Sequence, residues 1–253
     1  MTPKQLAALT TRRLRDAGSP EVARGALAYF KSPEGVALHG VSVPEARGIA
    51  KELYALVRAA WTTDEAIAYC DRCVRRPEME TKWVGFWTLG RFEKTFSRAL
   101  LTTVKKWIAA NLCNNWALID ALCPAVLTPL MRCHPALIPA VESWSGSPNM
   151  WLRRAAVVTF VPLARKGEQL EAAYGVVESL LDDGEDLIHK ACGWLLREAG
   201  KTDSARLERF LQAHGPRIPR TTVRYAIERM PAARRAALLR QTRAVRHTVA
   251  WGE

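Results

Sequence analysis

Trp116 and Asp120 stand four residues apart, a spacing that puts both side chains on one face of a helix, one turn apart. A tryptophan ring presents an electron-rich face, and an aspartate is negatively charged at neutral pH. The pair therefore suits a positively charged group. Aromatic and basic residues recur at helical spacing in two later stretches, which contain Trp151 with Arg154, and Lys190 with Trp194 and Arg197. We interpret the three stretches as parts of one site for a cationic group.

The charge of the chain indicates what kind of molecule carries that group. Lysine and arginine number 37, aspartate and glutamate number 25, and the formal net charge is +12. Such an excess suits a polyanion, because neutralising phosphates releases condensed counterions. A basic protein without such a partner is the alternative. We expect a nucleic acid, so the cationic group would be a piece of DNA.

The elements that must position these residues are expected to be helices. Apolar residues recur at three- and four-residue steps, proline and glycine interrupt them at short intervals, and no stretch alternates as a strand does. Residues 32–42 break the pattern and predict a loop. Ser19-Pro20 and 62–65 are good helix starts. The expected helices are 3–16, 20–31, 43–60, 62–76, one from Pro77, 94–109, 114–122, 125–133, 135–145, 148–164, 168–181, 185–199, 203–214, 219–229 and 231–241.

The spacing of three site residues indicates how the helices are arranged. Arg154 follows Asp120 by 34 residues, and Trp194 follows Arg154 by 40. These intervals are close to the period of HEAT or armadillo repeats, roughly 40 residues. Stacked repeats place equivalent helices along one concave wall. We therefore expect an all-α fold, a right-handed α-solenoid of degenerate HEAT-like repeats with a concave basic groove. Residues 1–240 would form a single domain, and 241–253 a basic tail, partly disordered.

Other conspicuous residues are expected to be structural. Trp83, Phe86 and Trp87 recur at helical spacing, which is more typical of a core than of a ligand site. Cys70 and Cys73 form a C-x-x-C without the second close pair that a zinc site needs, so buried thiols are expected rather than a metal. Cys113, Cys123 and Cys133 are ten residues apart, which is not ligand spacing. No apolar run approaches a membrane span and no signal peptide is visible, so we expect a cytoplasmic protein.

Five short stretches occur in the order found in a known family. They are Tyr29-Phe30-Lys31 with residues 39–47 (HGVSVPEAR), 115–120 (NWALID), 151–156 (WLRRAA), 188–198 (IHKACGWLLRE) and 220–226 (RTTVRYA). Together they resemble the AlkD-type DNA alkylation-repair glycosylases, which are built from HEAT-like repeats. The chain departs from the family pattern at His39, where the family often has an aromatic residue.

The resemblance implies an activity and a set of site residues. These enzymes hydrolyse the N-glycosidic bond of nucleotides that carry a cationic alkylated base, such as N7-alkylguanine or N3-alkyladenine. Trp116, Asp120 and Trp194 match the family's active-site residues, and Arg154, next to Arg153, matches its basic residue. The resemblance thus implies a monofunctional DNA glycosylase. Its partner would be double-stranded DNA containing alkylated purines; we expect it to act as a monomer without a cofactor or metal.

The residue types suit that reaction. A cationic base is already a good leaving group, and positive charge moves onto the sugar as the bond breaks. Asp120 would stabilise this charge and orient the attacking water. Opposite charges about 4 Å apart attract by some 4 kcal/mol at a moderate effective dielectric, although only the part that grows toward the transition state accelerates the reaction. Trp116 and Trp194 would face the cationic sugar or base. A surface salt bridge for Asp120, and packing for the tryptophans, are the alternatives.

Basic residues near these positions are expected to bind DNA phosphates. Arg154, Lys190 and Arg197 would flank the lesion, and the other predicted contacts are Lys31, Arg153, Arg220, Thr221 and Arg224. A solvated helix face is the alternative for each. Lys190 could also act as an amine nucleophile, which would give lyase activity, but no second feature supports that role.

Substrate selection is expected to depend on the lesion's charge. The resembled family tolerates lesions without enclosing the base in a pocket, unlike most base-extruding enzymes, so uncharged lesions should be poor substrates. Two rival functions remain: a non-catalytic HEAT-repeat protein that binds distorted or branched DNA, and a helical-repeat scaffold for proteins. A helix-hairpin-helix glycosylase would need a glycine-rich hairpin, which we do not find.

Overall fold

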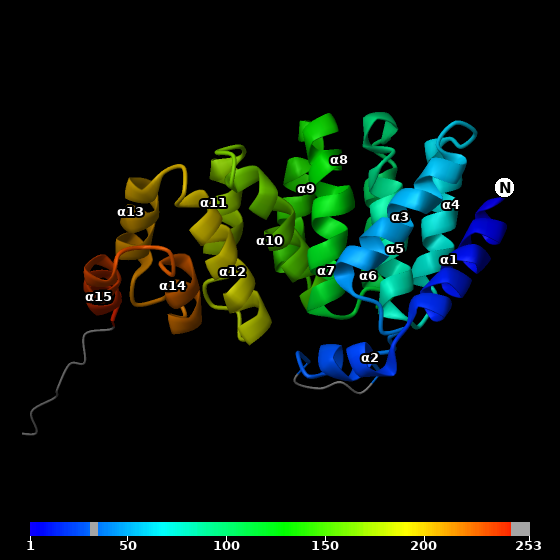
Figure 1. The fold of residues 1–253 in the computed structure, drawn as a ribbon. Coiled ribbons are helices and arrows are strands. Elements are labelled where there is room, and N and C mark those ends of the chain that lie inside the picture. Colours follow the sequence, from blue (N-terminus) through cyan, green and yellow to red (C-terminus); the bar gives the residue numbers. More distant parts are fainter. Residues whose placement is uncertain (31–34, 244–253) are drawn as a thin grey trace, which may run out of the picture. The chain divides into compact units, whose positions relative to one another are not determined.

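The computed structural model describes residues 1–30 and 35–243, and over these residues the chain is helical (Figure 1). Outside the helices, Ala37 and Glu78 form one isolated bridge, and the described residues contain no strand. The predicted all-α fold is confirmed. The chain divides into two compact units, Met1–Ile138 and Pro139–Glu253. That residues 1–240 act as a single domain remains a prediction, and of the expected tail only residues 241–243 are described.

Unit 1 is built around α5, which packs against α3, α4 and α7. Because α5 contacts both α3 and α7, these three helices form a row. Helix α1 packs against α4, α3 and α5. The helices are α1 (Pro3–Ala17), α2 (Pro20–Leu27), α3 (Val43–Val57), α4 (Thr63–Val74), α5 (Met79–Gly90), η1 (Glu93–Thr95), α6 (Leu100–Ala109), α7 (Trp116–Leu122), η2 (Cys123–Leu127), α8 (Thr128–Cys133) and η3 (Pro135–Leu137).

Unit 2 repeats this arrangement. Helix α12 packs against α10 on one side and α14 on the other, so α10, α12 and α14 form a row, with α11 against α10 and α12. Beyond α9 (Ile138–Glu142), which begins at the unit boundary, the helices are η4 (Ser143–Gly146), α10 (Met150–Ala164), α11 (Leu170–Glu178), α12 (Asp186–Ala199), α13 (Ser204–His214), α14 (Arg220–Ala226) and α15 (Ala232–Gln241).

Local capping explains where several helices begin. The hydroxyl of Ser19 accepts a hydrogen bond from the amide of Val22, with Pro20 in the first turn, as the sequence predicts. Thr62 and Glu65 form a reciprocal capping box at α4. Asn115 caps α7 through the amide of Leu118. These caps satisfy amides that have no partner inside the helix.

The predicted helix 94–109 is correct only in its second part. Residues 93–95 form a short 3-10 turn, and α6 does not begin until Leu100. Phe96 between them is extended, with φ −60° and ψ 129°. Its carbonyl accepts a hydrogen bond of 2.7 Å from the ring of His134, a contact from far along the chain. Tertiary structure therefore overrides the helical pattern here.

The break predicted between residues 122 and 125 is instead a π-helical turn. Pro124 has no N–H to donate to the carbonyl of Asp120, and the ladder widens so that the amide of Thr128 bonds the carbonyl of Cys123. The stretch Trp116–Cys133 thus runs on as helix, with a mean hydropathy of 1.3. It is long and apolar enough to span a membrane, which the sequence analysis did not anticipate. Half of the stretch is buried, and the core helix of a soluble protein passes the same test of length and composition. The stretch is therefore weak evidence for a membrane span.

The aromatic stripe of α5 belongs only partly to the core. Phe86 is fully buried, as predicted, but Trp83 and Trp87 are part-exposed. Of the six cysteines, Cys133 is exposed and the others are buried. Burial raises the pKa of Cys73 and of Cys113 to about 12, so both are neutral thiols. Within the described ranges, no group of three or more His, Cys, Asp or Glu side chains is placed to hold a metal.

Candidate functional site

Helix α7 places Trp116 and Asp120 on its half-exposed side. Trp116 is the first helical residue, and Asp120 follows one turn later. Leu118, Ile119 and Leu122 are buried on the opposite side and fix the rotation of the helix. Both candidate residues are only half-buried, so the structure places them on one face as the spacing predicted.

One aromatic contact and one hydrogen bond hold this end of α7 in place. The ring of Phe30 lies against that of Trp116, with centroids 5.5 Å apart and planes tilted by 30°. The indole nitrogen of Trp83 on α5 donates a 3.2 Å hydrogen bond to the carbonyl of Ala117. An aromatic pair such as that of Phe30 with Trp116 contributes about 0.5–1.5 kcal/mol beyond burial. Trp116 is therefore positioned by the chain before α3 and by α5.

A buried carboxylate that the sequence analysis missed fixes the loop of the family-like motif. Glu80, at the start of α5, is 1% exposed. Its two oxygens accept hydrogen bonds from the backbone amides of His39 (3.0 Å), Gly40 (2.9 Å) and Val41 (3.2 Å). Gly40 has φ +82°, and a β-carbon there would lie 2.0 Å from the carbonyl oxygen of Ser19, so no other residue fits. The ring of His39 hydrogen bonds Thr81 at 3.0 Å.

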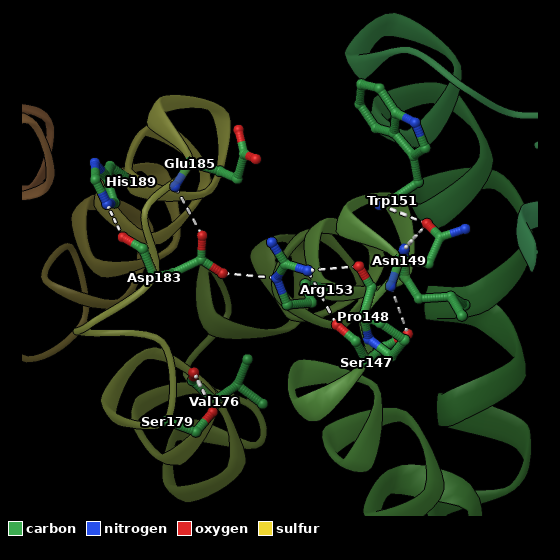
Figure 2. Close-up of polar contacts among 11 residues, drawn as sticks. Ser147, Pro148, Asn149, Trp151, Arg153, Val176, Ser179, Asp183, Glu185 and His189 are labelled. Atoms are coloured by element: carbon green, nitrogen blue, oxygen red, sulfur yellow. Dashed lines mark hydrogen bonds and ion pairs between the residues drawn. The ribbon is translucent and has the colours of Figure 1, made fainter.

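In unit 2, Arg153 and Arg154 have different surroundings. Arg153 forms a 2.6 Å ion pair with Asp183 and donates to the carbonyls of Ser147 and Pro148 at 3.0 and 3.1 Å (Figure 2). It joins the start of α10 to the loop before α12. Arg154 is 5% exposed and donates to the carbonyl of Leu187 at 2.6 Å. Arg153 is thus tied into the fold, and Arg154 lies between α10 and the start of α12.

The ring of Trp151 lies apart from this cluster. Its backbone amide donates to the side-chain oxygen of Asn149, the cap of α10, at 2.9 Å. Figure 2 shows the indole directed away from Arg153.

Lys190 and Trp194 lie one turn apart on α12, as the spacing predicted. Lys190 forms an i,i+4 ion pair of 2.8 Å with Asp186, and that hydrogen bond is the main reason its pKa is raised. A lysine so protonated is a poor amine nucleophile at neutral pH. Trp194 is half-buried and follows Gly193. A β-carbon on Gly193 would lie 2.4 Å from that of Tyr225, so glycine at this position lets α14 approach α12 closely.

The other predicted DNA contacts differ in what holds them. Arg197 is paired with Glu228 on the chain beyond α14. Arg220 donates to the hydroxyl of Thr242 at 2.9 Å and to the carbonyl of Leu239 at 3.1 Å, and burial lowers its pKa. Thr221 is half-exposed and Arg224 is exposed.

Lys31 lies outside the described residues. The DNA contacts assigned to all these residues, Arg153 and Arg154 included, remain predictions. That Trp116, Asp120, Arg154 and Trp194 belong to one site also remains a prediction.

Comparison with known proteins gives the chain a family. The family model described as DNA alkylation repair enzyme matches residues 10–230, which span both units. The chain belongs to this DNA alkylation repair enzyme family. A solved structure titled "Predicted DNA alkylation repair enzyme from Enterococcus faecalis" is similar, with a TM-score of 0.73 and 19% identity over 85% of this chain and 97% of that one.

The family fixes the broad role of the chain. No significant match is found among curated proteins. The structural likeness, at 19% identity, supports the fold, and the family match supports a role in DNA alkylation repair with DNA as partner. The five short stretches predicted a DNA alkylation-repair family, and the family match confirms that prediction.

Proposed function

We propose that this member of the family is a monofunctional DNA glycosylase that releases cationic alkylated purines, such as N7-alkylguanine and N3-alkyladenine, from double-stranded DNA. The observation that carries the proposal is the half-exposed face of α7, where Trp116 and Asp120 lie one turn apart. An electron-rich ring beside a carboxylate favours a group that is positive, or becomes positive.

The reaction follows from the charge of the substrate. The bond between C1′ and the base nitrogen breaks, and its electron pair leaves with the base, which becomes neutral. Positive charge is transferred to the deoxyribose as an oxocarbenium ion. Asp120 stabilises that charge and orients water, whose oxygen bonds C1′ and whose proton passes through the carboxylate to solvent. The product is an abasic site.

The aromatic residues contribute through their ring faces. Trp116 is held by Phe30, so its position does not have to be ordered when DNA binds. No general acid is required, because the base is already cationic. Neutral lesions should therefore react much more slowly than N7-methylguanine.

A glycosylase assay with Asp120→Asn tests the proposal. The substrate is a duplex with one N7-methylguanine, and base release is measured as alkali-labile abasic sites. We expect Asp120→Asn to lower the single-turnover rate by about 100-fold or more, since a preorganised electrostatic group is lost. Its affinity for unmodified duplex should not fall, because the change removes a negative charge.

The matched control is Asp16→Asn on the exposed side of α1, which should release base at the wild-type rate. Equal release by the wild type and by Asp120→Asn would remove this carboxylate from the mechanism. Tight binding to branched DNA, with no release above the protein-free rate, would favour a non-catalytic binder instead.

A further inference from the structure

A strip of aromatic and arginine side chains runs along α3 and α5 in unit 1. Trp83 and Trp87 on α5 and Arg91, its C-cap in helical conformation, follow one another at four-residue steps, so they share one face. On α3, Arg47 and Tyr54 are seven residues apart and also share a face. The two helices pack against each other, which brings these faces together.

The contacts within the strip pair each arginine with a ring. The guanidinium carbon of Arg47 lies 4.2 Å from the centroid of the Trp87 ring, and that of Arg91 lies 5.5 Å from the Tyr54 ring. Trp87 also stacks on Trp83, with centroids 5.9 Å apart and planes at 28°. The ring of Trp87 is thus engaged within the protein, which disfavours it as a platform for a stacked base.

Neither arginine is neutralised by the protein. Arg47 and Arg91 are both exposed, and within residues 1–30 and 35–243 their guanidinium groups form no ion pair or side-chain hydrogen bond. Other arginines, such as Arg75 with Asp71, are paired with carboxylates. An aromatic ring holds the guanidinium plane while leaving its N–H edge unoccupied. That edge matches phosphate oxygens in geometry and charge.

The strip ends at the helix of the candidate catalytic pair. Trp83, its terminal ring, donates its indole N–H to the carbonyl of Ala117, next to Trp116. The row α3, α5, α7 therefore carries both the strip and the face of Trp116 and Asp120. DNA held near α7 would have its backbone within reach of neighbouring helices of the same row.

We propose that Arg47 and Arg91 bind phosphates of the DNA backbone, with Trp87 and Tyr54 holding their guanidinium planes. The inference rests on the proposed function, because it extends the same DNA contact along unit 1. The ligand is the sugar–phosphate backbone of a duplex, independent of sequence and of the lesion. Removing either arginine should therefore weaken the binding of damaged and undamaged DNA equally.

The test is the salt dependence of binding to an unmodified duplex. Each phosphate contact contributes about 0.9 to the negative slope of log affinity against log salt concentration. We expect Arg47→Ala to lower the slope by about 0.9 and the double variant Arg47→Ala with Arg91→Ala by about 1.8. Arg47→Lys keeps the charge, so its slope should equal that of the wild type while its affinity falls.

The control is Arg72→Ala, which removes one exposed arginine from α4, a helix that packs on α1 and α5. Its slope should not change. Wild-type slopes for both alanine variants would overturn the inference while leaving the proposed function intact. A wild-type protein without salt-dependent DNA binding would overturn both.

Discussion

Two arginines of unit 1 and three arginines of unit 2, all candidate DNA contacts, are held in different ways. In unit 1, Arg47 and Arg91 rest on aromatic rings and have no carboxylate partner among the described residues. In unit 2, Arg153 is paired with Asp183, Arg197 with Glu228, and Arg220 with the end of α15. Aromatic support keeps the charge of the cation available to a ligand, whereas ion pairing satisfies it inside the protein. A count of basic residues on a helix face therefore does not measure how much of that face can bind DNA.

The largest effect that would sharpen this contrast is expected from Arg153→Ala. The carboxylate of Asp183 is 6% exposed and would lose its charged partner. Breaking a buried pair by removing one member costs about 3–5 kcal/mol. The free energy of unfolding, measured with urea, should fall by that order.

Arg224→Ala is the matched control, since Arg224 is exposed on α14 and its removal should change stability by less than about 0.5 kcal/mol. A normally stable Arg153→Ala protein with a shallower salt slope would make Arg153 a DNA contact and break the contrast.

The close packing beside Trp194 predicts the next largest effect. In Gly193→Ala the new methyl group would meet Tyr225 and the carbonyl oxygen of Thr222, 2.4 and 2.7 Å away. Overpacking of this kind costs about 1–3 kcal/mol. Gly175→Ala on α11 is the control: nothing lies within 4 Å, and the change should leave stability equal or raise it by about 0.4–1 kcal/mol. Thermal unfolding of both variants measures the difference, and equal midpoints would show that α12 and α14 can separate at little cost.

A smaller loss of stability is expected from Arg47→Ala in unit 1. An exposed cation–π contact is worth about 0.5–1 kcal/mol, so unfolding should be nearly unchanged although DNA binding weakens. Urea unfolding beside the Arg153→Ala protein makes the comparison direct. A loss as large as that of Arg153→Ala would mean that the strip is structural.

The smallest effect is expected from Glu198→Gln, and it concerns how stability falls as the pH is lowered. Burial alone would raise the pKa of Glu198, but hydrogen bonds from Lys201 and Arg165 outweigh it and hold the pKa below its ordinary value. A depressed pKa contributes stability above the unfolded value, about pH 4.3, and this is lost as pH falls through the folded value. Glu198→Gln should be less stable at neutral pH but lose less on acidification. Parallel acid unfolding curves for the two proteins would contradict this.

Local residues predicted most of the helices, but long-range contacts decided the exceptions. Ser19, Thr62 and Asn115 cap their own helices, so their sequence neighbourhood was sufficient. The extended backbone at Phe96 depends on His134, which no local pattern contains. The π turn after α7 could have been anticipated only from Pro124 inside an apolar helix.

In the candidate site, too, the features that depend on spacing within one helix were predictable, and those that depend on distant partners were not. The spacing of Trp116 and Asp120 gave their shared face, because periodicity acts within one helix. The partners of Arg153 and Arg197 were not predictable, because Asp183 and Glu228 come from other elements. The four-residue steps of α5 were visible in the sequence, and their interpretation as core holds fully for Phe86 but only in part for Trp83 and Trp87, which are part-exposed.

Glu80 has a consequence for how unit 1 opens. One carboxylate holds three successive amides in a connection that contains no helix or strand, from His39 to Val41. Amide hydrogens in loops ordinarily exchange fast with solvent. These three can exchange only when their hydrogen bonds to the Glu80 carboxylate break. These amides should therefore exchange in deuterated water as slowly as those inside α5, and all three together.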